Sequence, residues 1–375
     1  MKVLNVTAML NPLLGGGIAE RTIQMSHFQH KAGIECSVLT IDSGITDELT
    51  EYLDGIKIVA LPYISDRFHI PLPLLLTIGR LVKASDIVHL ISHWTILNVL
   101  VYLCIVWYRK PYVVCPAGAL KKFGRSGLLK TIFNWFIGIK IIKNASICLA
   151  VTHDEVAHFT AYGVSEDDVV VIPNGIVIDS RKPNMEDEFR RKTQLKSNPY
   201  ILFMGRLNPI KGTDLLIDAF CKWQRESGSD YHLVVAGSDG GLLPSLQAKV
   251  SDAGLEEIVH FTDFLSGEEK QQAYLSADLL MIPSRSEAMS IVVLEAAVFN
   301  TPALVTNMCG LNYLEEKEYG WVCEATSDSI CRGLALSLNA TDRLIRGKNF
   351  KIFVESNFEW SRLIVKYNAL YKSIM

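Results

Sequence analysis

The sequence lacks most of the patterns that mark metal-binding, disulfide-bonded and nucleic-acid-binding proteins. Its eight cysteines include no Cys-x-x-Cys pair, which disfavours a zinc site or a disulfide framework and fits reduced core thiols in a cytosolic protein. No Asp-x-Asp occurs in the chain, so there is no obvious carboxylate pair to hold a catalytic metal. The net charge is −3, and a chain without a basic excess is not expected to bind nucleic acid.

Targeting segments and some catalytic signatures are also absent. The first ten residues contain one lysine, a short apolar run and no convincing cleavage site, so we expect a first strand there rather than a signal peptide. The most apolar run, residues 94–108, is shorter than the roughly 20 residues that span a bilayer, and a buried helix is favoured. No Gly-x-Ser-x-Gly is present, which counts against an α/β-hydrolase.

What the chain does contain is a regular alternation of short β-branched runs and helical stretches. With 375 residues, of which 49% are hydrophobic, it is long for one core, and two domains are expected. The strand runs do not alternate polar and apolar residues, as is typical of parallel strands buried on both faces, so the fold class is doubly wound α/β. We expect strands at 2–8, 36–41, 56–61, 86–91, 111–115, 146–150 and 169–172, then at 200–204, 231–236, 258–261, 278–282, 302–306 and 320–323.

A polar, charged segment at 173–199, with three prolines, separates the two series of strands. Because it interrupts the pattern, it marks the domain boundary. We therefore expect a Rossmann-like N-terminal domain over 1–173 and a Rossmann-like C-terminal domain over 174–357. The closing segment, 358–375, is amphipathic and no strand follows it, so we expect a helix there.

Two glutamates, Glu287 and Glu295, stand in the otherwise apolar and small-residue stretch 284–297. Burying a carboxylate without a partner is costly. Glu287 is expected in the loop after a strand, and Glu295 in a helix that begins near Ser290. Carboxylates accept hydrogen bonds from pairs of sugar or ribose hydroxyls, and the free N–H groups of residues 289–292 would face an anion. A capping role for Glu287 and a salt bridge for Glu295 explain the spacing equally well.

A second group of polar residues follows the first strand of the second half. Gly205 permits a tight turn, and Arg206 and Lys211 come next, before a helix that starts near Thr213. Two cations at the carboxyl end of a strand, beside a helix N-terminus, can hold a diphosphate. A solvated loop with two ordinary surface cations is the alternative.

Glycine turns and a histidine follow other strands. Residues 15–17 are three glycines after the first strand, where backbone can approach a ligand closely. A nucleotide-binding turn for NAD is the competing interpretation, although the dinucleotide fingerprint and the P-loop lysine are both missing. Gly237 opens another glycine loop. His93 lies just past a strand and could face a cleft, although a lone histidine is more often structural, and His89 is expected in the core.

Together these residues resemble glycosyltransferase family 4, the group 1 glycosyltransferases. The resemblance covers nearly the whole chain and implies a GT-B fold, with two Rossmann-like domains facing a cleft and helix 358–375 crossing back to pack on the first domain. The motifs that carry it are Gly-Arg-Leu-x-x-x-Lys-Gly at 205–212, Ala-Gly at 236–237, Pro-Ser-x-x-Glu at 283–287, Glu-x7-Glu at 287–295, the glycines at 15–17, His-Trp at 93–94 and Pro-Asn-Gly at 173–175.

The resemblance also implies retaining transfer from a nucleotide-diphosphate sugar, with no metal and no cofactor required. The catalytic group would be Glu287, Arg206, Lys211 and His93. The two cations would hold the diphosphate and stabilise its developing charge, Glu287 would bind hydroxyls of the donor sugar or lie near its reacting face, and His93 would touch the sugar. Glu295 would accept from the ribose hydroxyls. The other donor-binding positions would be Gly16, Gly17, Gly237, Leu265, Met289, Ser290 and Ile291.

The chain departs from the family pattern at two places. Where the family often has Gly-Phe-Gly after the first glutamate, this chain has Ala288-Met289-Ser290, a change that keeps backbone contacts and leaves the sugar preference open. Where many relatives have Pro-His-Gly or Pro-Arg-Gly, it has Pro116-Ala117-Gly118. A polar contact on the acceptor side is then missing or supplied by another residue.

Residues 121–143 combine six basic residues, no acidic residue and many large apolar side chains. Such a segment predicts a surface that lies on an anionic membrane, and a core-facing helix with solvated lysines is the alternative. The membrane interpretation suits a cytoplasmic protein that is peripheral on the inner face of the cell membrane and uses a polyprenyl-diphosphate-linked acceptor.

The leading hypothesis is a retaining glycosyltransferase that acts on a glycan or lipid-linked acceptor in the synthesis of a bacterial surface polysaccharide, such as lipopolysaccharide O-antigen, capsule or exopolysaccharide. The alternative from another class is a non-catalytic sugar-nucleotide-binding or scaffold subunit with the same fold. A relative that uses a sugar phosphate or performs epimerisation is a third hypothesis.

Overall fold

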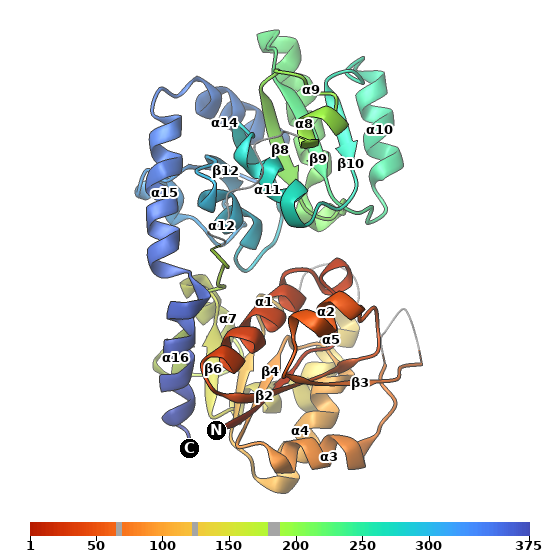
Figure 1. Ribbon diagram of the computed structural model, residues 1–375, viewed down its shortest axis with the longest axis vertical. Coiled ribbons are helices and arrows are strands. Elements are labelled where there is room, and N and C mark those ends of the chain that lie inside the picture. Colours follow the sequence, from red (N-terminus) through yellow and green to blue (C-terminus); the bar gives the residue numbers. More distant parts are fainter. Residues whose placement is uncertain (65–69, 122–126, 179–187) are drawn as a thin grey trace. The chain divides into compact units, whose positions relative to one another are not determined.

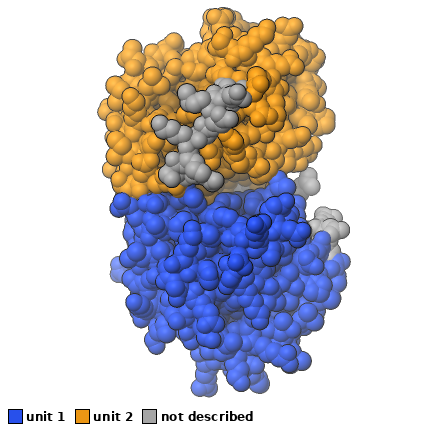
Figure 2. Space-filling model, in the orientation of Figure 1, with its two compact units in different colours: residues 1–177, 358–375 blue, residues 178–357 orange. Residues whose placement is uncertain are grey.

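The computed structural model describes residues 1–64, 70–121, 127–178 and 188–375. These residues form two compact units, each with its own hydrophobic core. The first unit comprises Met1–Val177 and Phe358–Met375, and the second comprises Ile178–Asn357 (Figure 2).

The described part of the first unit is built on a seven-stranded parallel sheet in the order β3-β2-β1-β4-β5-β6-β7 (Figure 1). Each strand lies within two residues of the predicted range. The central strands are buried on both faces, which explains why their sequences show no alternation. The strands are β1 (Lys2–Val6), β2 (Glu35–Ile41), β3 (Lys57–Leu61), β4 (Ile87–Ile91), β5 (Tyr112–Cys115), β6 (Ile147–Ala150) and β7 (Val169–Val171).

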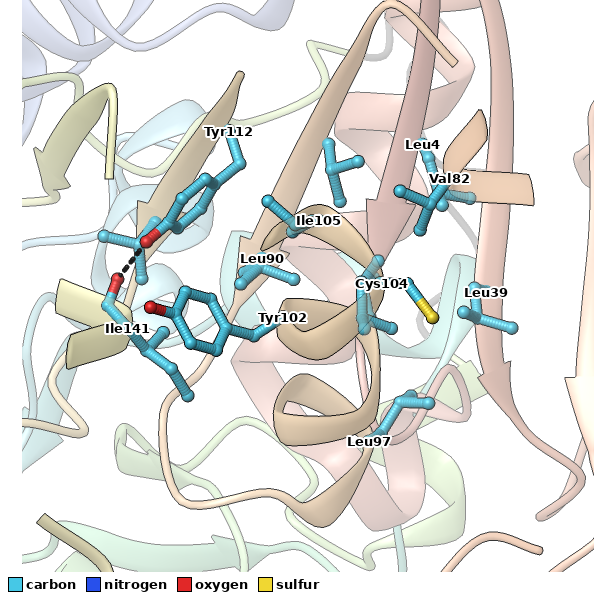
Figure 3. Packing of buried hydrophobic residues seen from close by; sticks show 14 of the residues in the cluster. Leu4, Leu39, Val82, Leu90, Leu97, Tyr102, Cys104, Ile105, Tyr112 and Ile141 are labelled. Carbon is cyan, nitrogen blue, oxygen red and sulfur yellow. Dashed lines mark hydrogen bonds between the residues drawn. The ribbon is translucent and has the colours of Figure 1, made fainter. Parts of the chain in front are cut away.

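Helices cover both faces of this sheet, as a doubly wound fold requires. One core takes buried residues from α3, α4, α6 and α7, and Figure 3 shows Leu97, Tyr102 and Ile105 of α4 against the strand residues Leu4 and Leu90. The helical segments of this unit are α1 (Pro12–Lys31), α2 (Asp47–Tyr52), α3 (Leu75–Ala84), α4 (Ile96–Tyr108), α5 (Gly127–Phe133), the π-helical turn η1 (Asn134–Gly138), α6 (Ile139–Lys143), η2 (His153–Glu155), α7 (Val156–Thr160), η3 (Glu166–Asp168) and α16 (Trp360–Lys372).

The first helix begins earlier than the sequence predicted. The glycines at 15–17 were expected in a turn ahead of a helix, but α1 already begins at Pro12. Asn11 caps it, since its side-chain oxygen accepts from the N–H of Leu13 at 2.8 Å, and proline suits the first helical position. Gly16 then breaks the helix with φ 56° and ψ −140°, a conformation that side chains with a Cβ rarely adopt. The glycines therefore form a kink within the helix.

Helix α16 packs on α1 through buried polar contacts within the first unit. Arg21 of α1 donates to the hydroxyl of Tyr367, and Gln29 donates to the hydroxyl of Tyr371 at 3.0 Å. The same Tyr371 oxygen lies 2.8 Å from Nδ1 of His89, which is in the core as predicted. These contacts tie the C-terminal segment into the sheet of the first unit.

Helix α4 is buried on one side only. The sequence predicts a buried helix for the apolar run at 94–108, and the sheet-facing side of α4 does lie in the core. The other side exposes Leu103, Val106 and Trp107, the last at 81%. Among the described residues, no helix is both long and apolar enough to cross a membrane.

The described part of the second unit contains a six-stranded parallel sheet in the order β10-β9-β8-β11-β12-β13. All of these strands are confirmed within about one residue, and the helix predicted to start near Thr213 begins at that residue. Its elements are α8 (Glu188–Lys192), β8 (Tyr200–Met204), η4 (Pro209–Lys211), α9 (Thr213–Ser227), β9 (His232–Ala236), α10 (Leu243–Asp252), β10 (Val259–Thr262), α11 (Gly267–Leu275), β11 (Leu279–Ile282), α12 (Ile291–Val298), β12 (Ala303–Thr306), α13 (Tyr313–Glu316), β13 (Trp321–Cys323), α14 (Ser327–Asn339) and α15 (Arg343–Asn357).

Candidate functional site

The candidate site lies where the strand order of the second unit reverses. Strand β8 has β9 on one side and β11 on the other. Met204 pairs with Ala236 at the ends of β8 and β9, and Leu280 of β11 pairs with Leu202 of β8. The three strands therefore end at the same level, and their loops share one edge of the sheet. Ligands of open α/β sheets bind at such switch points.

Lys211 and Glu287 meet at this edge. Lys211 ends the 3₁₀ turn η4 after β8, and Glu287 lies in the loop after β11. The Lys211 Nζ atom is 2.9 Å from Glu287 Oε1, and the two side chains are 31% and 11% exposed. The Ser284 hydroxyl donates to the same carboxylate oxygen. A cation and a hydroxyl thus compensate the cost of burying Glu287.

Arg285, which sequence reasoning missed, joins the two loops that carry this pair. Its guanidinium binds both carboxylate oxygens of Asp214, each at 2.7 Å. It also donates to the carbonyl of Pro209 at 2.6 Å, and its own N–H donates to the carbonyl of Ile210 at 2.8 Å. Burial would raise the pKa of Asp214, but the hydrogen bonds and charge of Arg285 outweigh it and lower that pKa. Arg285 therefore fixes the turn before Lys211 against the loop of Glu287.

We expect Arg285→Met to lower the free energy of unfolding by about 1–2 kcal/mol at pH 7. The expected loss is no larger because both side chains of the ion pair are partly exposed and solvent screens their charges. The Asp214 pKa is depressed from 3.8, so the pair stabilises the fold above that pH and loses its effect as the pH falls through the folded pKa. Denaturant titrations from pH 7 down to pH 3 measure the difference. Lys222→Met, which removes the exposed Lys222–Asp328 pair, is the control, and equal losses in the two variants would contradict the role of Arg285.

Glu295 is held by a second pair of residues that the sequence did not reveal. On α12, its Oε1 lies 2.7 Å from Nζ of Lys270, and its Oε2 accepts from the hydroxyl of Tyr274 at 2.8 Å. Both partners come from α11, four positions apart, which places them on one face of that helix. Burial raises the Tyr274 pKa well above its usual value, so the hydroxyl remains a donor. The salt bridge that was an alternative for Glu295 is thus present.

Gly237 and Arg206 lie where the β8 and β9 loops approach each other. Gly237 has φ 148°, and a Cβ there would overlap the carbonyl oxygen of Gly205, so only glycine fits. Arg206 is half-exposed, and its Cγ would be 3.1 Å from a Cβ built on Gly240. The predicted cation therefore lies beside a glycine loop at the same edge as Lys211.

One backbone N–H group just before α12 already has a hydrogen-bond partner within the second unit. The N–H of Ser290 donates to the carbonyl of Cys309 at 3.2 Å, so this N–H does not face an anion, contrary to the expectation for residues 289–292. Ile291 begins the helix, where first-turn N–H groups lack helical partners. Met289 is buried, as is Leu265 in the loop between β10 and α11.

The remaining predicted residues belong to the first unit. Gly16 is half-buried and Gly17 is exposed at the kink of α1. His93 is 1% exposed, and its Nε2 lies 3.1 Å from the side-chain oxygen of Asn134. Because an amide oxygen only accepts, Nε2 carries the proton. Burial lowers the His93 pKa to about 4, so the ring is neutral at pH 7. Its Nδ1 has no hydrogen-bond partner within the described residues.

Two doubly wound units with charged loops at a switch point define a two-domain Rossmann-like protein. Sequence profiles of known families identify it further. The profile described as "Glycosyl transferases group 1" matches residues 185–344, and the one described as "Glycosyltransferase Family 4" matches residues 15–180. Together they cover most of the chain, which belongs to this glycosyltransferase family.

Individual relatives agree with this assignment. An uncharacterized glycosyltransferase of Methanocaldococcus jannaschii is 27% identical and is matched over 100% of this chain and 99% of its own length. The crystal structure of HepE from Anabaena in complex with UDP-glucose has a TM-score of 0.83 at 19% identity, and the match covers all of both chains. The crystal structure of WaaG, a glycosyltransferase involved in lipopolysaccharide biosynthesis, has a TM-score of 0.73 at 18% identity. The match covers 100% of this chain and 99% of the WaaG chain. The fold is GT-B, as the resemblance implied.

Proposed function

We propose that this glycosyltransferase transfers a sugar from a nucleotide-diphosphate sugar to a glycan or lipid-linked acceptor, with retention of the anomeric configuration. The observation that carries the proposal is the Lys211–Glu287 pair, 2.9 Å apart at the switch point of the second unit. A cation matches a diphosphate, and a carboxylate matches sugar hydroxyls. The UDP-glucose in the HepE structure supports a donor of this class.

The charges of the site suit the departure of a nucleoside diphosphate. Breaking the bond to the anomeric carbon leaves negative charge on the diphosphate, and fixed cations stabilise charge where it develops. Lys211 would exchange Glu287 for a phosphate oxygen, while Arg206 would bind from the neighbouring turn. Glu287 would then accept from hydroxyls of the donor sugar. A neutral His93 would act as a hydrogen-bonding group toward the sugar and not as a cation.

Glu295 is assigned to the ribose of the donor. Lys270 and Tyr274 each take one position on its oxygens, and a carboxylate offers about four. Acceptor capacity therefore remains for two hydroxyls. The positions Gly16, Gly17, Gly237, Leu265, Met289, Ser290 and Ile291 are assigned to the donor by the family resemblance.

A thermal-shift screen against UDP-, GDP- and ADP-sugars tests donor binding. We expect one class to raise the melting temperature by mass action, with about 2.7 kcal/mol of stabilisation at a hundredfold excess over Kd. Arg206→Ala should abolish the rise. Glu295→Gln should weaken binding of the ribonucleotide sugar by about tenfold and leave binding of its 2′,3′-dideoxy analogue unchanged. An equal loss for both compounds would contradict the ribose assignment.

Retention and independence of metal are further parts of the proposal, implied by the family resemblance. Nuclear magnetic resonance of the product reports the anomeric configuration directly. Activity that survives treatment with a chelator supports transfer without a metal. An inverted product or a chelator-sensitive enzyme would contradict the corresponding part.

We assign the acceptor and the membrane contact to the first unit. Segment 121–143, which contains α5, η1 and α6, exposes Leu128 and Trp135, each at 75%, and Phe136 at 62%. Lys140 and Lys143 are exposed beside them. Residues 122–126 lie outside the described part of the chain. Exposed apolar and basic side chains together suit an anionic membrane, and we propose peripheral binding at the inner face of the membrane, where polyprenyl-linked acceptors in surface polysaccharide synthesis would be reached.

Flotation with vesicles containing phosphatidylglycerol tests this contact. We expect the full chain to float, and Trp135→Ser/Phe136→Ser to lower the bound fraction by about tenfold because two aromatic side chains no longer insert. Unchanged flotation of this variant would remove segment 121–143 from the proposal.

The alternative of a non-catalytic subunit with the same fold makes a separate prediction. Such a protein would bind a donor in the thermal-shift screen and show no hydrolysis or transfer with any acceptor preparation. The intact set of Arg206, Lys211, Glu287 and Glu295 favours the enzyme over this alternative.

A further inference from the structure

Helices α3 and α4 pack side by side on the first unit (Figure 1) and present an apolar, basic outer side. We call this the α3–α4 surface, and it consists of Leu76, Arg80, Leu103, Val106, Trp107 and Arg109. Leu76 and Trp107 are each 81% exposed, and Leu103 and Val106 are about half-exposed. Arg80 and Arg109 are also exposed.

The exposed positions follow helical spacing. On α4, Leu103, Val106 and Trp107 stand three and four positions apart and share one side, and on α3 Leu76 and Arg80 do the same. The opposite side of α4 packs in the core shown in Figure 3. A helix that is apolar all round is normally covered on all sides. Within the described residues, nothing covers this side of α4.

The surrounding charge is of one sign. From Arg67 to His153 the sequence contains eleven lysines and arginines and a single acidic residue, Asp86, whereas the whole chain has a net charge of −3. The positive charge is therefore concentrated in the part of the first unit that contains α3 to α6. Such a field attracts an anionic partner over distances of about a Debye length.

Helices α3 and α4 belong to the same helix layer as α6 of segment 121–143. Helices α3, α4 and α6 contribute to one core cluster on the same face of the sheet. The side-chain amide of Asn144 donates to the hydroxyl of Tyr102 at 2.8 Å, which ties the end of α6 to α4. The amine of Lys130 lies 5.5 Å from the ring of Trp94, next to the start of α4. A flat surface such as a membrane that contacts one of these helices would therefore lie close to the others.

We propose that the α3–α4 surface binds an anionic lipid membrane and forms a second contact beside segment 121–143. Apolar side chains at helical spacing can insert below the headgroups, and the arginines can pair with lipid phosphates. Trp107 suits the boundary between headgroups and acyl chains. A second copy of the chain fits less well, because a two-fold contact would bring Arg80 and Arg109 of both copies together. The contact goes beyond the proposed transfer and is measurable without donor or acceptor.

The test uses the full chain with phosphatidylcholine vesicles that contain or lack phosphatidylglycerol. Leu76→Ser/Trp107→Ser should lower the partition coefficient for the anionic vesicles by about tenfold or more. Leu336→Ser/Val365→Ser is the matched control, since both residues are exposed leucine or valine side chains elsewhere on the chain, at 61% and 65%, and it should bind like the wild type. Vesicles with brominated acyl chains should quench wild-type fluorescence more than that of Trp107→Phe.

Several outcomes would overturn the proposal. Wild-type binding by Leu76→Ser/Trp107→Ser is one, and equal quenching of the wild type and Trp107→Phe is another. A wild-type dimer that this variant converts to a monomer would assign the surface to a second copy. Loss of donor hydrolysis in the absence of vesicles, with secondary structure unchanged, would show that the substitutions act on the enzyme and not on a lipid contact. Trp135→Ser/Phe136→Ser tests the other segment separately, so failure there leaves the α3–α4 surface standing.

Discussion

Lys211→Ala is expected to lower kcat/KM for sugar transfer by about a hundredfold or more. Removal of one charged or hydrogen-bonding group that stabilises developing charge typically has an effect of this size. Lys211 has a second role, because its Nζ neutralises Glu287 at 2.9 Å. The variant therefore loses the cation and leaves a nearly buried carboxylate beside the position proposed for the diphosphate, where like charges repel.

The kinetic pattern distinguishes transition-state stabilisation from simple donor binding. If Lys211 acts mainly on the departing diphosphate, kcat falls as much as kcat/KM, whereas a binding role alone would raise KM. Lys222→Ala, which removes the exposed pair with Asp328, is the control and should be unaffected. A Lys211→Ala enzyme with wild-type kcat and unchanged circular dichroism would exclude Lys211 from the chemistry.

Arg21→Met is expected to destabilise the first unit by about 3–5 kcal/mol. Arg21 is 1% exposed, and its guanidinium donates to the side-chain oxygen of Asn174 at 2.6 Å and to the hydroxyl of Tyr367. A hydrogen bond to a charged group is worth about 1.5–3 kcal/mol, and its loss leaves buried polar atoms unsatisfied. Arg21 thereby joins α1 both to the segment after β7 and to α16.

Calorimetry on the full chain measures this loss as a shift of the first unit's transition by about 10 °C, at 2–4 °C for each kcal/mol. Arg362→Met, on the exposed side of α16 with 63% of its side chain accessible, should shift the transition by no more than about 2 °C. Equal shifts in the two variants would mean that the contacts of Arg21 do not hold α16 on α1.

The strands were predictable because their pattern is local. Runs such as 200–204 and 278–282 are apolar at every position, and that composition needs no knowledge of partners to indicate a buried parallel strand. The loops of Lys211 and Glu287 were predictable as neighbours for a related reason, since parallel strands place their carboxyl ends at one edge. The helix boundary at Pro12 was not predicted, because three glycines outweighed an Asn-Pro start that is equally visible in the sequence.

The side chains that bind Glu295 and that hold the loop of Glu287 were not predictable from the sequence. Lys270 and Tyr274 lie 25 and 21 positions before Glu295, and Arg285 reaches back to Asp214 over 71 positions. Their spacing on α11 shows a shared helix face, but no local pattern says which face turns toward α12. Arg285 looked like an ordinary charged residue between two serines. A residue whose role is to hold another in place has no motif of its own.

The sequence by itself determined the two series of parallel strands, the order in which loops follow them and the family to which those loops belong. Each of these follows from residues adjacent in the chain, through burial on both faces and glycine or charge at strand ends. Only the tertiary structure decided which cation meets which carboxylate, that His93 is enclosed, and that α4 is exposed on one side. Those outcomes depend on how helices rotate and pack on the sheet, where side chains far apart in sequence compete for the same partner or the same cover.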